Sequence, residues 1–393
     1  MKSIQKWVLF FIFEIMRITK LFSEFLSSEK AGGFILIACT ILSLVLANSI
    51  WSESYLHLWH YQFGNHPLEY WINDGLMTIF FLLIGLELER EMYVGELSNF
   101  KNALLPICAA IGGMLIPAGL YLWLNYGTIT QSGAGIPMAT DIAFALGILS
   151  LLGNRVPVSL KVFLTALAVI DDLGAILIIA VFYTKTLIWS NLLIALGIFA
   201  LLFVLNRVKV RNVIPYLIGG IVMWYFMLNS GVHATITGVL LAFVIPFGSG
   251  NKKSTSFVLQ HFLHKPVAFI ILPIFALANT AIILNPDWHY ALRHQYTLGI
   301  ALGLLIGKPL GIWLFSFLSV KLKISTLPED LNWKSILGVS FLGGIGFTMS
   351  IFITLLAFSD GDYINNSKIM ILISSLIAGI IGIIYLKSTL KKS

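Results

Sequence analysis

The chain has 393 residues, of which 58% are hydrophobic and only 11% are charged, and its mean hydropathy is +0.91. Ordinary soluble domains carry roughly a quarter charged residues, so the composition excludes a soluble protein and predicts a polytopic membrane protein. The net charge of +7 arises from basic residues that follow the membrane topology. We therefore predict no nucleic-acid partner.

The first 32 residues are predicted to form a cytoplasmic tail. Within this tail, residues 7–22 (WVLFFIFEIMRITKLF) are apolar, with Glu14, Arg17 and Lys20 interspersed and no small-residue cleavage site. This pattern indicates an amphipathic helix at the membrane interface and not a signal peptide.

Apolar runs of about 18 residues, the length that crosses the hydrocarbon core, recur along the rest of the chain. We count twelve of them, at 33–50, 71–88, 103–123, 134–152, 162–183, 190–205, 213–229, 232–247, 266–284, 297–319, 336–358 and 369–386. The connections run to only about 15 to 20 residues and leave no room for a soluble domain. The sequence thus predicts an all-α membrane protein with one transmembrane domain over residues 1–393.

The first outer loop, residues 51–70, contains an alternating aromatic pattern. Aromatic or histidine residues occupy every second position from Tyr55 to Phe63, and a Gly64-Asn65 turn signal follows. This pattern is typical of a β-hairpin. The alternative is a belt of interfacial aromatic side chains.

The distribution of Lys and Arg predicts the orientation, because basic loops stay in the cytoplasm. With twelve spans, the two tails and the even-numbered connections all lie on one side. They hold all of the 25 basic residues except Lys185, Arg293, Lys308 and Lys368. Both termini are therefore predicted to be cytoplasmic.

Four ionisable residues fall near the middle of spans: Asp141, Asp171, Asp172 and Lys308. Each opposes insertion by roughly 2.5–3.5 kcal/mol at the bilayer centre. A single ion pair that fastens helices together would explain two of them. Three acids against one base leave a surplus of carboxylate, which protons or a cation must neutralise. This points to ion chemistry.

Asp171 and Asp172 are adjacent within one helix. Neighbouring helical residues point about 100° apart, so the two carboxylates serve different neighbours. One of them can pair with Lys308 while the other faces a cavity.

Two spans carry signals of a helix that breaks and restarts. Residues 131–147 (QSGAGIPMATDIAFALG) combine glycines with Pro137 and the polar pair Thr140-Asp141. Residues 342–353 (LGGIGFTMSIFI) contain Gly343, Gly344 and Gly346, followed by Thr348 and Ser350. Such a pair of interrupted spans is typical of inverted-repeat secondary transporters, which bind ions at the breaks, although membrane glycines also serve close packing.

These features together resemble the NhaA-type sodium–proton antiporters over nearly the whole chain. The resemblance rests on WINDGLMTIFFLLIGLELERE (71–91), ATDIAFALG (139–147), ALAVIDDLGAI (166–176), SGVHATITG (230–238), LIGKPLGI (305–312) and GGIGFTMSIFI (343–353). It implies electrogenic exchange of Na⁺ or Li⁺ for H⁺ by alternating access. The implied setting is the bacterial inner membrane, and the implied role is pH and sodium homeostasis.

The resemblance also implies roles for individual residues. Asp172 is implied to be the main Na⁺ ligand, and Asp171 to pair with Lys308. Asp141 and Thr140 are implied to lie close to the ion and to compensate the facing helix ends. A homodimer, joined partly through the outer hairpin, is implied as well.

A second group of residues is implied to set the pH response. Asp74 begins span 2, and Glu87, Arg90 and Glu91 end it in a cytoplasmic funnel. The alternative for these residues is an ordinary solvated helix end, which we favour for Glu89.

Three histidines belong to the same prediction. His261 and His264 precede span 9 without a third metal ligand, so pH response or interfacial placement is favoured over zinc. Many family members have an acid where this chain has Gln260, a difference that bears on the pH threshold. His233 is implied to modulate the pH response, or it is a hydrogen-bonded interfacial histidine.

Three other function classes fit the sequence less well. Intramembrane aspartyl proteases carry Tyr-Asp and Gly-x-Gly-Asp motifs, whereas here Asp141 follows Thr140 and Asp171 follows Ile170. A channel needs rings of like groups around a pore, and one asymmetric acid cluster does not supply them. A sodium-coupled solute symporter of the same fold remains the alternative. We expect no enzyme activity.

The predicted mechanism follows from charge balance. Burial disfavours the charged forms of carboxylate and ammonium groups alike, so both kinds of group can exchange protons near neutral pH. The site holds either protons or Na⁺ and opens alternately to each side of a lipid bilayer. Cys39 and Cys108 have no metal-site spacing, and no cofactor is expected.

Overall fold

The computed structural model describes residues 31–390 except 185–186, 249, 285–288 and 290–291. The predicted interfacial helix at 7–22 therefore lies outside the described residues. The described part is almost entirely helical, with one two-stranded sheet. The predicted all-α membrane fold is confirmed.

The helices and strands follow one another in a simple order. The first half comprises the helix Ala31–Ala47, α2 (Ser52–His60), β1 (Gln62–Phe63), β2 (His66–Pro67), α3 (Leu68–Trp71), η1 (Ile72–Leu76), α4 (Met77–Tyr93), η2 (Glu96–Ser98), α5 (Phe100–Asn125), η3 (Ile129–Met138), α6 (Ile142–Ser150), η4 (Gly153–Arg155), α7 (Val158–Phe182) and α8 (Trp189–Arg207). The second half comprises α9 (Ile214–Leu228), α10 (Ile236–Val244), α11 (Thr255–Pro266), η5 (Val267–Ile271), α12 (Leu272–Asn279), α14 (Gln295–Leu302), η6 (Gly303–Gly307), α15 (Lys308–Lys321), α16 (Trp333–Gly343), α17 (Phe347–Ala357) and α18 (Gly361–Thr389).

All twelve predicted apolar segments contain a helix, but they differ in length. Eight helices of the described residues are long and apolar enough to cross a membrane, and two bent pairs bring this number to ten at most. The remaining two segments are the 15-residue α9 and the 9-residue α10. α10 ends just before Pro246, because the residue that precedes a proline is disfavoured in a helix.

The predicted outer hairpin is present but much shorter than its aromatic pattern indicated. Gln62 pairs with Pro67 and Phe63 with His66, around a turn in which Gly64 has φ +67°. Residues 52–60 form helix α2, so the expectation of a strand from Tyr55 was wrong. Tyr55 and Trp59 are four residues apart and stack edge to face across one helical turn.

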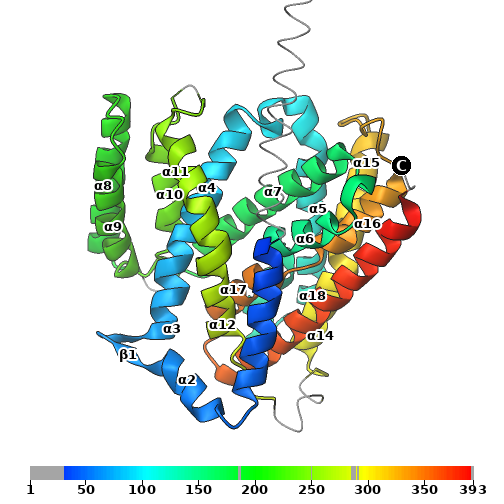
Figure 1. Ribbon diagram of the computed structural model, residues 1–393, viewed down its shortest axis with the longest axis horizontal. Helices are drawn as coiled ribbons and strands as arrows, with labels where there is room; N and C mark the ends of the chain where they lie inside the picture. Colours follow the sequence, from blue (N-terminus) through cyan, green and yellow to red (C-terminus); the bar gives the residue numbers. More distant parts are fainter. Residues whose placement is uncertain (1–30, 185–186, 249, 285–288, 290–291, 391–393) are drawn as a thin grey trace, which may run out of the picture.

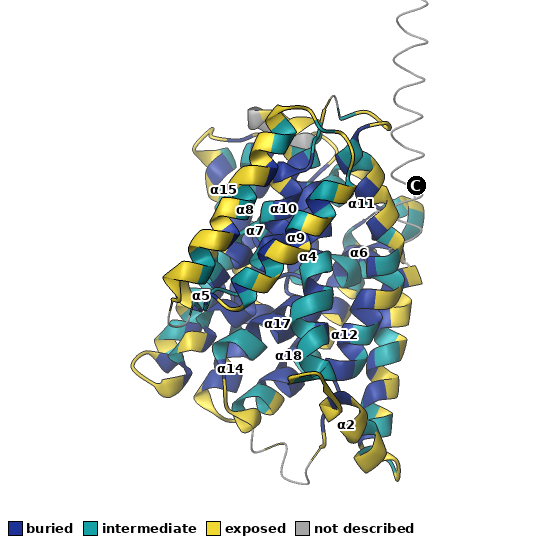
Figure 2. Cartoon of the chain, turned by 90° about the vertical axis from the view of Figure 1, so that its left-hand side faces the viewer, coloured by how far each residue is buried: buried dark blue, intermediate teal, exposed yellow. Residues whose placement is uncertain are grey.

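The helices form two neighbouring groups (Figure 1). α4, α8, α9 and α10 lie together at one edge, and α5, α15, α16 and α18 lie at the other. Glycines allow close approach within each group, as where Gly85 of α4 faces Ala242 of α10 and Gly112 of α5 meets Gly311 of α15. Figure 2 shows that α8 is largely exposed, whereas α17 is buried in the interior. The functional residues described below lie around α17.

Candidate functional site

Two interrupted helices cross in the interior. η3 and α6 are separated by extended residues 139–141, and α16 and α17 meet at 47° across residues 344–346. The amide of Asp141 donates a hydrogen bond of 2.7 Å to the carbonyl of Ile345, which joins the two breaks directly. Gly344 and Gly346 lie within the second break, so both predicted interruptions are present.

Asp141 caps the two helices that restart from the crossing. Its Oδ1 accepts from the amide of Phe144 in α6 at 2.9 Å. Its Oδ2 accepts from both the amide and the hydroxyl of Thr348 in α17, at 3.0 and 2.5 Å. A carboxylate at a helix N-terminus is stabilised by the free amides and the helix dipole. Both oxygens of Asp141 are thus committed to helix ends.

Lys308 and Thr140 bind the carbonyl ends of the two preceding helices. The Lys308 ammonium donates to the carbonyl of Met138, which ends η3. The Thr140 hydroxyl lies 2.9 Å from the carbonyl of Gly343, which ends α16. A cation near a helix C-terminus is favourable for the dipole. All four helix ends at the crossing therefore have a compensating partner.

The Asp171–Lys308 pair lies beside the crossing. Lys308 Nζ is 2.9 Å from Asp171 Oδ2, and both side chains are 0% exposed. The Thr140 hydroxyl is 2.7 Å from the same oxygen. Lys308 begins α15 directly after the π-helical turn η6, a type of turn that is frequent at functional sites.

Asp172 differs from its neighbours because none of the described residues forms a hydrogen bond with its carboxylate. The residue is 0% exposed, and neither carboxylate oxygen is paired within the described part of the chain. An unpaired polar group in an apolar environment is costly, so such a carboxylate requires a proton or a cation.

Asp172 lines a cavity together with the residues of the crossing. The cavity is lined by Gly32, Leu36, Phe80, Leu83, Ile84, Glu87, Thr140, Asp141, Ile142, Ala143, Asp172, His264, Val267, Ala268, Leu272, Thr348 and Met349. It offers about 40 Å³ to the centres of water molecules, and one water needs roughly 10–15 Å³ by this measure. The space accommodates a few waters or one partly hydrated ion.

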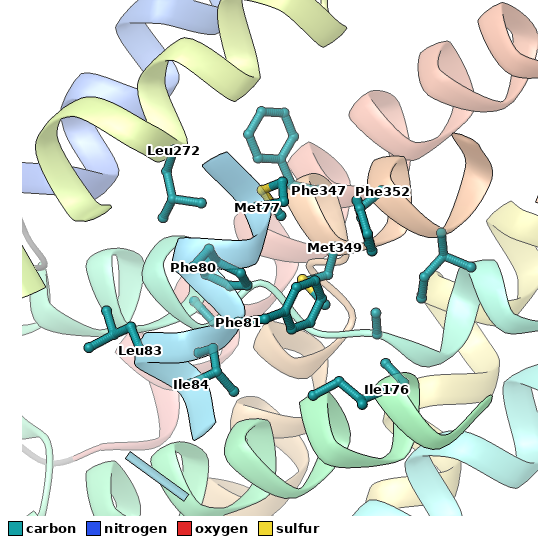
Figure 3. Packing of buried hydrophobic residues seen from close by; sticks show 14 of the residues in the cluster. Met77, Phe80, Phe81, Leu83, Ile84, Ile176, Leu272, Phe347, Met349 and Phe352 are labelled. Carbon is teal, nitrogen blue, oxygen red and sulfur yellow. The ribbon is translucent and has the colours of Figure 1, made fainter. Parts of the chain in front are cut away.

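Buried apolar side chains of α4 and α17 pack together next to this space (Figure 3). Along α4 the cavity lining extends from Phe80 to Glu87, and Met77 lies one turn before it. The rings of Phe81 in α4 and Phe352 in α17 lie 5.3 Å apart, and Met349 lies next to them. We name Met77, Phe81, Met349 and Phe352 the apolar plug.

Comparison with known proteins identifies the family. The profile of the family described as Na⁺/H⁺ antiporter 1 matches residues 23–386. The Na(+)/H(+) antiporter NhaA of Flavobacterium psychrophilum is 72% identical over 378 residues, 96% of this chain and 98% of that protein. This chain belongs to the Na⁺/H⁺ antiporter 1 family.

Two further relatives in this antiporter family are nearly as similar. The Na(+)/H(+) antiporter NhaA 1 of Flavobacterium johnsoniae is 66% identical over 372 residues, 95% of this chain and 98% of that protein. The Na(+)/H(+) antiporter NhaA of Cytophaga hutchinsonii is 63% identical over 377 residues, 96% of this chain and 97% of that protein. The resemblance inferred from the sequence motifs is therefore confirmed.

The predicted pH-response residues of this antiporter gather partly at the cavity. His264 Nδ1 lies 3.7 Å from Glu87 Oε1, and both residues line the cavity. Arg90 stacks on the Phe257 ring at 4.7 Å and reaches Gln260 Oε1 at 3.5 Å. The partner of Arg90 at position 260 is therefore an uncharged amide and not a carboxylate.

Other predicted pH-response residues lie outside the cavity. His261 is exposed and stacks on Phe257. His233 Nε2 lies 2.9 Å from the carbonyl of Tyr183. Asp74 belongs to the π-helical turn η1, and Glu91 lies near the end of α4.

Sequence reasoning missed three polar residues of this antiporter. Glu89 was expected to be solvated but is 4% exposed, and it lies one helical turn beyond Gly85, which packs against α10. Lys368 was assigned to an outer connection but is 5% exposed within α18, which begins earlier than predicted. Ser375 of α18 accepts from the amide of Phe347 and caps α17.

No resident metal centre is found among the described residues. They contain no group of three His, Cys, Asp or Glu side chains that could hold a metal ion. Cys39 and Cys108 are free and half-buried.

Proposed function

We propose that this protein exchanges Na⁺ for H⁺ as a secondary active antiporter. The proposal is supported by its family and by one observation above all, the buried and unpaired carboxylate of Asp172 in a cavity of ionic size. Sodium prefers oxygen ligands, and the same carboxylate oxygens bind a proton. The carboxylate of Asp172 can thus carry either Na⁺ or H⁺, and one ion cannot cross while the other occupies the carboxylate.

The neighbouring residues hold the site in shape. Asp171 and Lys308 form an ion pair beside the crossing, and the Thr140 hydroxyl donates to the same oxygen of Asp171. Asp141 keeps the N-termini of α6 and α17 together and lies in the cavity wall. We propose that Asp141 and Thr140 approach the ion from this wall while Asp172 binds it directly.

We further propose that the cavity is the cytoplasmic pathway. It extends to Glu87 near the end of α4 and to His264 near the end of α11, and the positive-inside rule supports a cytoplasmic position for this side. The apolar plug separates Asp172 from the other side. Both termini are then cytoplasmic, in a bacterial inner membrane, and transport requires the plug to open as the cytoplasmic path closes.

Several finer properties belong to the same proposal. Li⁺ is proposed as an alternative substrate, because it is a hard cation like Na⁺. Glu87, Arg90, Glu91, Asp74 and the histidines His233, His261 and His264 are proposed to adjust the pH response. We also propose a homodimer formed through the outer hairpin and one transport domain over residues 1–393. The proposal includes no cofactor and no enzyme activity.

A sodium-coupled solute symporter is the alternative function. The volume at Asp172 admits only a few water-sized particles, whereas organic ligands occupy pockets of roughly 300–1,000 Å³. The geometry therefore favours an ion as the cargo.

Proteoliposomes with an internal pH dye test the proposal. We expect added Na⁺ or Li⁺, but not K⁺ or Ca²⁺, to move protons across the membrane without any organic solute. An absence of proton movement at saturating Na⁺ contradicts the proposal.

A further inference from the structure

Two asparagines meet where η1, the π-helical turn before α4, packs against the end of α12. Asn279 Nδ2 donates to Asn73 Oδ1 at 2.7 Å, and the reciprocal contact is 3.5 Å. Asn279 is 0% exposed and Asn73 is half-buried. We name these two residues the amide pair.

On the first helix, Asn73 lies beyond the residues that line the cavity. Residues 77, 80, 84 and 87 follow steps of three and four, the spacing of one face of an α-helix. Phe80, Ile84 and Glu87 line the cavity, and Met77 belongs to the plug. Asn73 precedes Met77 by four residues, within the π-helical turn η1, and so lies about one turn further along the same span.

The second helix repeats this order. Leu272 begins α12 and lines the cavity, and Asn279 ends α12 two turns later. Asn279 Nδ2 also donates to the carbonyl of Phe275 on the same side of the helix, at 3.0 Å. Two polar side chains thus meet where the cavity-facing rows of both helices end, opposite Glu87 and His264.

The chemistry of the amide pair suits a transient cation site. Each amide contributes one oxygen acceptor, and hard cations bind amide and carbonyl oxygens. In the arrangement seen here each oxygen faces the partner's amino group, so the closed pair needs no ion or water. Separation of η1 from α12 frees both oxygens.

We propose that Asn73 and Asn279 form a second sodium station on the outer half of the pathway, closed on itself while the plug is shut. This inference rests on the proposed antiport. When the outer side opens, the two amide oxygens replace part of the hydration shell of Na⁺ on its way to or from Asp172. The rival explanation is that the amide pair only fastens η1 to α12.

Sided transport measurements separate the two explanations. Everted vesicles present the cytoplasmic face to added Na⁺, and right-side-out vesicles present the outer face. For Asn279→Leu we expect the outer apparent KM for Na⁺ to rise about tenfold, the change that 1.4 kcal/mol produces, with the cytoplasmic KM unchanged. If the amide pair only joins the two helices, Asn279→Leu should change the outer and the cytoplasmic KM for Na⁺ by the same factor, or change neither.

A second variant keeps the test decisive if Asn279→Leu folds poorly. Asn73→Asp retains the oxygen that accepts from Asn279 and adds a negative charge, so we expect a lower outer KM. Asn125→Leu is the matched control, because Asn125 is also 0% exposed but hydrogen-bonds to Tyr121 and Gln295 away from this row. It should lower the melting temperature without a sided change in KM.

The outcomes distinguish the two levels of the proposal. If the unmodified protein moves no protons in response to Na⁺, the proposed antiport fails. If it does and Asn73→Asp leaves the outer KM unchanged, or changes both KM values by one factor, the sodium station is overturned.

Discussion

Asp141 and Asp172 are both buried carboxylates that line one cavity, yet their surroundings are opposite. Asp141 accepts three hydrogen bonds from the starts of two helices. Asp172 accepts none from the described residues. The difference teaches that burial alone does not mark a transport group: the protein itself supplies partners for Asp141, whereas in the proposed mechanism Asp172 is left for a mobile ion.

Removal of the charge at Asp172 should have the largest effect on transport. Asp172→Asn leaves no carboxylate to bind Na⁺ or H⁺, so we expect sodium-driven proton movement to be abolished in proteoliposomes. The melting temperature should not fall, because no hydrogen bond is lost. Near-normal transport at saturating Na⁺ removes Asp172 from the ion site.

The next largest effect concerns the Asp171–Lys308 pair. Lys308→Ala leaves Asp171 buried without its partner, and breaking a buried pair typically costs about 3–5 kcal/mol. We expect a clearly lower melting temperature in detergent together with altered coupling. Lys265→Ala, at an exposed position, is the control. An unchanged melting temperature makes the pairing untenable.

The same chemical change at Asp141 sharpens the comparison with Asp172. Asp141→Asn keeps an oxygen for Phe144 but loses the acceptor and the charge that Thr348 requires. Hydrogen bonds to charged groups contribute about 1.5–3 kcal/mol, so we expect a lower melting temperature than for Asp172→Asn. Equal stabilities of the two variants contradict the assignment of Asp141 as the helix cap.

The smallest effect on transport is expected from a substitution beside Arg90, near the end of α4. Gln260→Glu adds a negative charge beside Arg90, which favours the protonated forms of titratable neighbours. Arg90 and Gln260 are only half-buried, and charge pairs at the protein surface are worth about 0.2–1 kcal/mol, so the pH profile of transport should move upward by about one unit or less. A shift to lower pH contradicts this interpretation, and the maximal rate should stay unchanged.

Much of this arrangement was predictable from the chain. Glycine and proline marked the two helix breaks, and the 100° offset of Asp171 and Asp172 predicted different neighbours for them. The sequence could not show that Asp141 has both oxygens occupied, because that depends on backbone amides of a helix about 200 residues away along the chain.

The wrong expectations have a common physical cause. The aromatic alternation at 55–63 also suits a surface helix, because side chains four apart share a helix face. Glu89 and Lys368 looked solvated because they lie near predicted span ends, but longer helices and neighbouring packing bury them. A short sequence pattern shows the periodicity of a helix or a strand, whereas residues distant in the sequence decide whether a given side chain is buried.

The dependence of Na⁺ saturation on pH tests the central claim most directly. If Asp172 binds Na⁺ and H⁺ in turn, the apparent KM for Na⁺ should rise about tenfold per unit fall in pH for each competing proton, in the acidic limit. High Na⁺ should then restore the rate lost to acid, measured at equal pH on both sides. A KM that is independent of pH while the maximal rate collapses contradicts competition at Asp172.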